Sequence, residues 1–192
     1  MNNRPRIVSR IHYNSPVILT FALLSLGILV LNVLTAGYTN GLLFSVYRSS
    51  LSDPLTYVRI FGHVLGHTSF AHYFGNMTLF LVIGPIVEEK YGSGNLLMAI
   101  AMTAVVTGGL HCLIAPGSAL LGASGVVFML ILLSAFTGEK DGTVPLTLIL
   151  VALIYLGKEI YGAIAVSDGI SQLAHIAGGG CGILSGIVLR KK

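Results

Sequence analysis

The sequence is poor in charge: only 18 of its 192 residues are Asp, Glu, Lys or Arg. A water-soluble domain carries about a quarter charged residues, so this scarcity argues against a soluble globule. Charge is absent altogether from residues 11–47, 60–87, 91–138 and 169–189. Because a helix of about 20 apolar residues crosses the hydrocarbon core of a bilayer, each of these stretches can hold at least one span. We therefore expect an all-α, polytopic membrane protein.

Tryptophan is absent, and the only cysteines are Cys112 and Cys181, both in apolar surroundings. Interfacial aromatic anchors must then be tyrosine and phenylalanine, and a disulfide scaffold is excluded by composition. The net charge of +4 does not indicate a nucleic-acid partner, because the cations gather at the two ends of the chain. These terminal cations are Arg4, Arg6 and Arg10 before the first apolar run, and Arg190, Lys191 and Lys192 after the last.

Six spans can be placed in a single domain of residues 1–192, from the apolar runs and the residues that interrupt them. They cover roughly residues 17–36, 72–90, 94–114, 118–137, 143–162 and 170–189. Residues 37–71 are too polar to span the bilayer and too long for a turn, so we expect a long interfacial loop there. With the N-terminus inside, eight Lys and Arg lie on the inner side and three outside. This distribution favours cytoplasmic N- and C-termini.

Polar residues stand out near the starts of three of these spans. His72 and Asn76 lie four residues apart and share a helix face. Ser124 lies early in the fourth span, within residues 122–125, and His175 lies early in the sixth. Burying an unpaired polar group in lipid costs several kcal/mol, so these side chains need partners. In the proposed threading, all three clusters lie at a similar depth below the outer face.

Small residues follow the same two spans at helical spacing: Gly122 and Gly125 on the fourth, and Gly178, Gly182 and Gly186 on the sixth. Glycine lets two membrane helices approach closely. His175 lies three residues before Gly178, on the same face of its helix. We therefore expect the two spans to touch and to bring Ser124 within hydrogen-bonding reach of His175.

This combination of residues is what acyl transfer requires. A serine hydroxyl becomes a strong nucleophile when a base removes its proton, and histidine is the usual base. The oxyanion that then forms needs preorganised donors, which the imidazole of His72, the amide of Asn76 and the backbone N–H of Ser124 could supply. The alternatives are structural: Ser124 as a small residue at a helix contact, and His72 and Asn76 as a cap or loop anchor.

His63 and His67 form an HxxxH pair, a pattern that invites a metal interpretation. The residues between them lack the glutamate of an HExxH site, and no carboxylate is nearby in the sequence. A structural role, holding the loop against the second span, is favoured. We expect no metal and no cofactor.

The three motifs together resemble those of the rhomboid family of intramembrane serine proteases. Residues 122–125, GASG, resemble its GxSG motif, and residues 174–182, AHIAGGGCG, resemble its AHxxGxxxG motif. Residues 72–76, HYFGN, match its HxxxN motif, and His63 and His67 precede them at the spacing usual in the family. Glu88 resembles the acidic residue near the end of the family's second span. The similarity runs from about residue 59 to residue 186.

The resemblance implies a six-transmembrane-helix bundle of the minimal bacterial type, in the plasma membrane. In that family Ser and His form a catalytic dyad without Asp, and the His and Asn of HxxxN help to bind the oxyanion. Those roles fall on Ser124 and His175, and on His72 and Asn76. The remaining motif positions, expected to support the site, are Gly122, Gly125, Phe128, Gly178 and Gly182.

The implied activity is hydrolysis of peptide bonds in or near transmembrane segments of other membrane proteins, at a site that opens to the extracytoplasmic side. Two features depart from the family. Phe128 stands where a tyrosine commonly packs on the catalytic histidine, and Val58 replaces the tryptophan of a Trp-Arg pair in the first loop. Neither change removes a catalytic group.

Two other functions are compatible with a polytopic protein. A catalytically silent relative would bind transmembrane clients without cleaving them, but such a protein would be expected to have lost the serine or the histidine. A small transporter would use its intramembrane polar residues to bind a solute. Transporter folds are usually built from repeated halves, and the sequence shows no convincing internal repeat.

Overall fold

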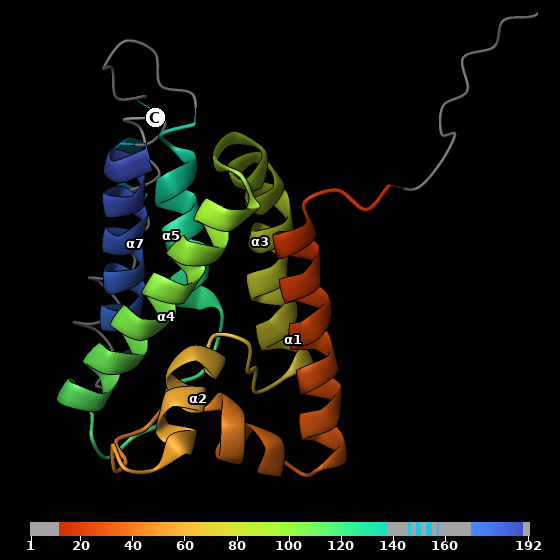
Figure 1. Cartoon of the computed structure of the whole chain (residues 1–192), viewed down its shortest axis with the longest axis vertical. Helices are drawn as coiled ribbons and strands as arrows, with labels where there is room; N and C mark the ends of the chain where they lie inside the picture. The colour runs from red at the N-terminus through yellow and green to blue at the C-terminus, as the bar shows by residue number, and fades with distance from the viewer. Residues whose placement is uncertain are drawn as a thin grey trace, which may run out of the picture.

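The computed structural model describes residues 12–137 and 170–189, together with residues 146, 149, 150, 153, 154 and 157. The long helices of the described part run side by side as a bundle, and two short helices lie beneath one end of it (Figure 1). In chain order the elements are α1 (Pro16–Leu34), the π-helix η1 (Asn40–Phe44), α2 (Pro54–Gly62), α3 (Phe70–Tyr91), α4 (Ser93–Ile114), α5 (Ser124–Ser134) and α7 (Ile170–Leu189).

Four of these helices are long and apolar enough to cross a membrane: α1, α3, α4 and, over Gln172–Leu189, α7. Their bounds lie within a few residues of the expected spans over 17–36, 72–90, 94–114 and 170–189. The expected span over residues 143–162 lies outside the described part of the chain, apart from isolated residues. The charge-free runs therefore identify the four long helices correctly.

The helix expected over residues 118–137 is shorter, because α5 covers only the 11 residues Ser124–Ser134. The chain before it is extended: Val46 and Leu120 form an antiparallel bridge with two backbone hydrogen bonds of 2.9 Å. Gly122 then has a φ of 130°, a conformation that favours glycine. Since the bridge and this turn use backbone geometry that no α-helix has, the helix begins only at Ser124.

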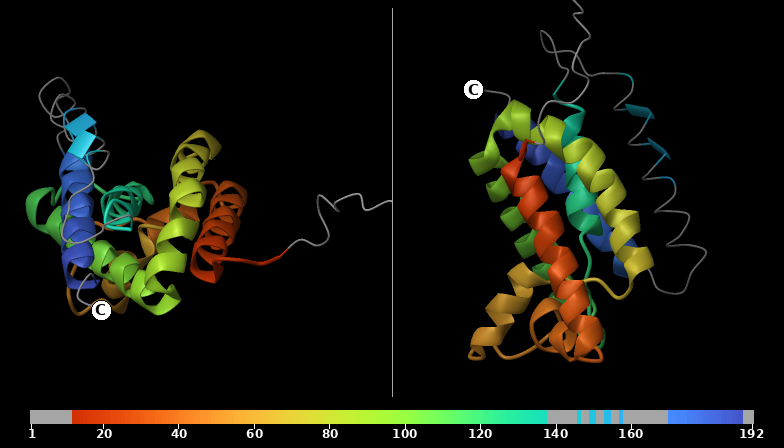
Figure 2. Two further views of the ribbon diagram at one scale, coloured as in Figure 1. Left: turned by 90° about the horizontal axis from the view of Figure 1, so that it is seen from above. Right: turned by 90° about the vertical axis from the view of Figure 1, so that its right-hand side faces the viewer.

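Helix α5 lies at the centre of the bundle, between α7, α4 and α3 (Figure 2). Every residue from 125 to 133 is buried. A helix that is hydrophobic on all sides is typical of such a central position. The side chain at its first residue, Ser124, is only partly buried.

The segment between α1 and α3 is held together by a buried cation. Arg59 on α2 donates from Nε to the carbonyl oxygen of Leu42 at 3.0 Å, and from a terminal nitrogen to the Asp53 carboxylate at 3.0 Å. Its guanidinium carbon also lies 4.6 Å from the centre of the Tyr47 ring. Asp53 caps α2 as well, accepting from the backbone N–H of Leu55 at 3.0 Å. Arg59 therefore fixes α2 against η1.

At the opposite end of the bundle, one carboxylate joins three helices. Glu88, buried near the end of α3, accepts hydrogen bonds from the backbone N–H groups of Val17 at 3.0 Å and Ile18 at 3.1 Å. It also accepts one from the hydroxyl of Ser93 at 2.7 Å, at the start of α4. The first N–H groups of a helix have no partner within it, and an anion at that end is favourable. Glu88 thus supplies hydrogen-bond acceptors for two of the first backbone N–H groups of α1.

Candidate functional site

A polar contact between α5 and α7 joins Ser124 and His175. The imidazole Nε2 of His175 lies 2.8 Å from Oγ of Ser124, a short hydrogen-bonding distance. Both side chains are partly buried rather than sealed in the core. Ser124 is the first residue of α5, so its backbone N–H is among those that the helix leaves without an internal partner. A hydroxyl, an imidazole and a helix N-terminus therefore meet at one place.

Glycine makes this contact possible, because α5 and α7 touch backbone to backbone. A β-carbon at Gly178 would overlap the carbonyl group of Gly125, and one at Gly182 would overlap that of Met129. Any larger residue at either position would push the helices apart. The separation of the helices, and with it the distance from Ser124 to His175, depends on these two glycines.

Phe128 sets the plane of the histidine ring. It lies one turn after Ser124 on α5, and its ring stacks on His175 with centroids 4.7 Å apart and planes within 6° of parallel. Aromatic pairs in such contact contribute about 0.5–1.5 kcal/mol beyond the area they bury. The aromatic ring expected at this position is therefore in contact with the imidazole, without the hydroxyl of a tyrosine.

His72, from α3, reaches the same place through the turn at Gly122. A β-carbon at Gly122 would lie 2.9 Å from both Nε2 and Cε1 of His72, and 3.9 Å from Oγ of Ser124. Real β-carbons essentially never make contacts this short, so any side chain at residue 122 would displace the His72 ring, and the φ of 130° also favours glycine. The absence of a side chain at Gly122 allows the imidazole of His72 to lie beside the serine.

Thr68 decides which nitrogen of His72 carries the proton. The backbone N–H of Thr68 donates to Nδ1 of His72 at 3.5 Å, and the Thr68 hydroxyl lies 3.2 Å from the same atom. A backbone N–H can only donate, so Nδ1 is the acceptor and the neutral ring carries its hydrogen on Nε2. Nε2 is the nitrogen next to Gly122. The ring thus offers a donor on the side where Ser124 lies.

Asn76 is buried one turn further along α3. Its side-chain nitrogen donates to the backbone carbonyl oxygen of His72 at 3.2 Å. An amide nitrogen carries two hydrogens, so this bond leaves one for another acceptor. The structure therefore places Asn76 beside His72, as its spacing in the sequence indicates.

His63 lies behind the Gly122 turn. Its Nδ1 lies 2.9 Å from the carbonyl oxygen of Ile60, and its Nε2 lies 3.2 Å from Oγ1 of Thr107 on α4. Its own carbonyl oxygen accepts a hydrogen bond of 2.9 Å from the backbone N–H of Gly122. Burial lowers the pKa of His63 to about 4, so the ring is neutral at physiological pH. This residue fixes the turn that precedes Ser124.

His67 supports His72 from the other side. It is fully buried, and its ring meets that of His72 edge to face at 5.0 Å between centroids. Asn40 of η1 donates to its backbone carbonyl oxygen at 2.9 Å. Burial lowers the pKa of His67 to about 4. Within the described residues no three potential ligand side chains gather as a metal site would need.

Comparison with known proteins gives one family. The model of the rhomboid domain matches residues 54–192. The chain is 28% identical over 167 residues to the rhomboid protease GlpG of Pectobacterium atrosepticum, covering 85% of this chain and 59% of that protein. It is 27% identical over 111 residues to the rhomboid protease GlpG of Haemophilus influenzae, covering 57% of each. The chain thus spans less than two thirds of the length of these curated relatives.

Proposed function

The chain belongs to the rhomboid family, and on this premise we propose that it is a serine endopeptidase acting within the membrane. It hydrolyses peptide bonds in or near transmembrane segments of other membrane proteins. The observation that carries this proposal is the 2.8 Å hydrogen bond between Ser124 and His175. It supports a nucleophile and its base in contact, within a bundle of helices that are apolar enough to span a bilayer.

In the proposed reaction, Ser124 Oγ attacks the carbonyl carbon of the scissile bond while Nε2 of His175 accepts the hydroxyl proton. The new C–O bond moves an electron pair of the carbonyl onto its oxygen, giving a tetrahedral oxyanion. Collapse of this intermediate breaks the C–N bond, and His175 gives its proton to the leaving amine. Water then attacks the acyl-enzyme with His175 as base, releasing the new carboxyl terminus and restoring the serine.

The oxyanion is stabilised by three donors. These are Nε2–H of His72, the second amide hydrogen of Asn76 and the backbone N–H of Ser124. Support comes from the tautomer that Thr68 imposes on His72 and from the position of Ser124 at the start of α5. The loss of a single such donor typically lowers kcat by about 10²–10³-fold.

The substrate follows from the depth of the site. A transmembrane helix keeps its peptide groups hydrogen-bonded within itself, so a scissile bond must leave the helix before Ser124 can reach it. We expect cleavage near small or helix-breaking residues, at the extracytoplasmic end of the substrate segment. The proposed topology has six spans, including residues 143–162, with both termini in the cytoplasm and residues 37–71 in the outer interface. The eight-to-three distribution of Lys and Arg supports this orientation.

A fluorophosphonate probe, which reacts with activated serine hydroxyls, tests the proposal on the detergent-solubilised protein. The wild type should be labelled, and Ser124→Ala and His175→Ala should not. Ser134→Ala is the matched control. Ser134 lies on the same helix, and its hydroxyl donates a hydrogen bond to the backbone carbonyl oxygen of Ile131. Persistent labelling of Ser124→Ala would show that another residue is the nucleophile.

A further inference from the structure

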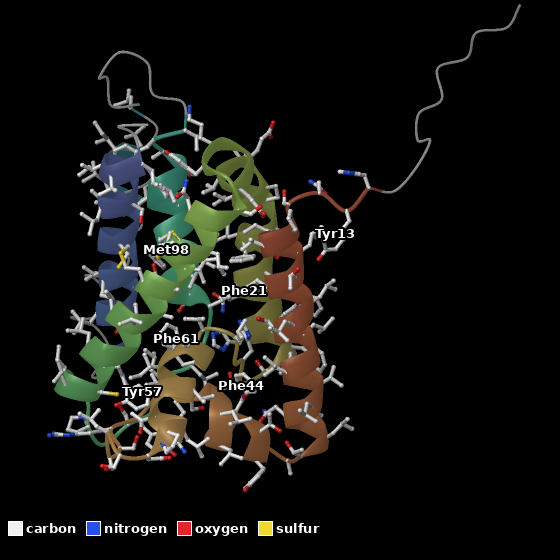
Figure 3. The ribbon with its side chains drawn as sticks, in the orientation of Figure 1. Tyr13, Phe21, Phe44, Tyr57, Phe61 and Met98 are labelled. Atoms are coloured by element: carbon white, nitrogen blue, oxygen red, sulfur yellow. The ribbon has the colours of Figure 1, made fainter. Side chains whose placement is uncertain are left out.

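A groove of about 560 Å³ lies between α1 and α4, away from the Ser124–His175 contact. One wall is formed by residues within 16–24 of α1, and the other by residues within 93–104 of α4. Phe61 of α2, with Val64 and Leu65 after it, closes one end. Figure 3 shows Phe21 and Phe61 in the space between these three helices.

The groove offers hydrocarbon surface and no free side-chain hydrogen-bonding group. Of the residues that line it, only Thr20 and Ser93 have polar side chains. Both already have partners: Thr20 Oγ1 lies 3.0 Å from the hydroxyl of Tyr13, and Ser93 donates to Glu88. A peptide or another polar ligand would lose its hydrogen bonds to water here without replacement. An alkyl chain makes no hydrogen bonds to water and therefore loses none on entering the groove.

Polarity varies along the groove in one direction. Ser93 is the first residue of α4, and Thr20 lies one turn into α1, where its hydroxyl meets that of Tyr13 from before the helix. The exposed Lys90 also lies close to this end in the chain. The other end is closed by aromatic and aliphatic side chains. A ligand that matches this arrangement has a polar head and an apolar tail.

The dimensions select the kind of tail. Residues 93–104 extend about 16 Å along α4 at 1.5 Å per residue, close to the ~15 Å of hydrocarbon in one leaflet. The groove therefore has the length of an acyl chain within one leaflet, and about half the length that a helix crossing both leaflets would occupy.

From these observations we propose that the groove is a lipid-binding site, which holds an acyl chain of a phospholipid with its head group at the Pro16–Ser93 end. The chain lies along Phe21 and ends against Phe61. Binding of the chain does not depend on the proposed peptide hydrolysis. In the orientation proposed above, the Pro16–Ser93 end faces the cytoplasm and the lipid belongs to the cytoplasmic leaflet; only this assignment rests on that orientation.

Because the sequence contains no tryptophan, a single introduced indole reports on the groove alone. Phe61→Trp places it at the closed end, and Leu97→Trp, at a position 58% exposed, places a second reporter on the α4 wall. Leu113→Trp, at a 78% exposed position at the far end of α4, is the control for bulk lipid. The probe is phosphatidylglycerol with brominated acyl chains, which quenches indole fluorescence on contact, added to the purified protein in detergent.

At about one to three lipids per protein, both groove reporters should lose half or more of their fluorescence, and Leu113→Trp should lose less than a tenth. Filling the groove with Ala101→Phe should abolish this quenching in the Phe61→Trp background. Val105→Phe, at a 43% exposed position of the same helix outside the groove, should leave it unchanged. If Phe61→Trp does not fold, Leu97→Trp carries the same comparison.

Three results would overturn the proposal. One is parallel quenching of the groove reporters and Leu113→Trp. Another is undiminished quenching after Ala101→Phe. The third is quenching at these ratios by a brominated free fatty acid but not by the phospholipid, since the groove would then not recognise a membrane lipid.

Discussion

A β-carbon on Gly122 would lie 2.9 Å from Nε2 of His72, so the turn before α5 and the imidazole of His72 lie this close only because residue 122 is glycine. The same turn is held by a hydrogen bond from its backbone N–H to the carbonyl oxygen of His63. Three segments, from α2, α3 and α5, thus meet at one residue without a side chain. The geometry around Ser124 depends on this meeting.

Gly122→Ala should therefore impair the site more than the fold. The methyl group displaces the His72 ring, and a φ of 130° strains any residue but glycine, at a cost of about 1–3 kcal/mol. We expect the rate of fluorophosphonate labelling to fall at least tenfold, with a lower melting temperature. Gly109→Ala is the control, because a β-carbon there meets nothing within 4 Å and alanine favours a helix. Labelling of Gly122→Ala at the wild-type rate would contradict the role given to this turn.

Asn76→Ala should reduce catalysis while the protein remains folded. If the amide binds the oxyanion, its loss raises the barrier by about 3–4 kcal/mol, or roughly 10²–10³-fold in kcat. The measurement is cleavage of a single-span test substrate in proteoliposomes. Asn95→Ala is a matched control, since its amide also donates to a backbone carbonyl four residues earlier, that of Tyr91, but on another helix. Equal turnover of the two variants would remove Asn76 from the proposed oxyanion site.

Phe128→Leu should lower kcat by about 2–10-fold, because it removes a stacking contact worth about 0.5–1.5 kcal/mol against His175. Phe128→Tyr keeps the ring and should retain turnover within about twofold. Both variants are compared by kcat and KM on the same substrate. A loss confined to KM would indicate that Phe128 contacts the substrate rather than positions the histidine.

Much of this arrangement could be predicted from the sequence, for identifiable reasons. The charge-free runs locate α1, α3, α4 and α7, because lipid excludes charge over a fixed length. Glycine spacing predicts the contact of α5 with α7, and with it the approach of Ser124 to His175. The catalytic roles of these residues stay predictions until the labelling experiment is done.

The structural features that the sequence does not predict depend on contacts between segments far apart in the chain. The bridge from Val46 to Leu120, which delays the start of α5, joins residues far apart in the chain and leaves no local pattern. Thr68 has no motif either, although its backbone and hydroxyl both reach Nδ1 of His72. The link between His63 and Gly122 is made by main-chain atoms, which any residue types would supply.

Glu88→Gln should destabilise the bundle without touching the site. The carboxylate accepts from two backbone N–H groups of α1 and from Ser93, and an amide offers one acceptor oxygen in place of two. We expect the free energy of unfolding to fall by about 2–4 kcal/mol, since hydrogen bonds to charged groups contribute about 1.5–3 each. Glu89→Gln, at the exposed neighbouring residue, should leave the melting temperature nearly unchanged. A melting temperature equal in both variants would show that Glu88 does not join these helices.

Acid should destabilise the protein through His63 and His67. Burial lowers the pKa of each to about 4 in the folded state, below the ordinary 6.5 of an exposed imidazole. Between pH 6.5 and 4 the unfolded chain therefore binds more protons, so the stability that is complete above pH 6.5 declines as the pH falls toward 4. Each histidine contributes a slope of up to about 1.4 kcal/mol per pH unit.

Thermal unfolding in detergent, measured across that pH range, checks this expectation. His63→Asn should have a lower melting temperature at pH 7 but a shallower decline toward pH 4 than the wild type, because one buried imidazole is gone. His12→Gln, at an exposed histidine before α1, should follow the wild-type curve. If His63→Asn and the wild type lose stability with the same pH dependence, the ring of His63 is not held neutral by its burial against α4.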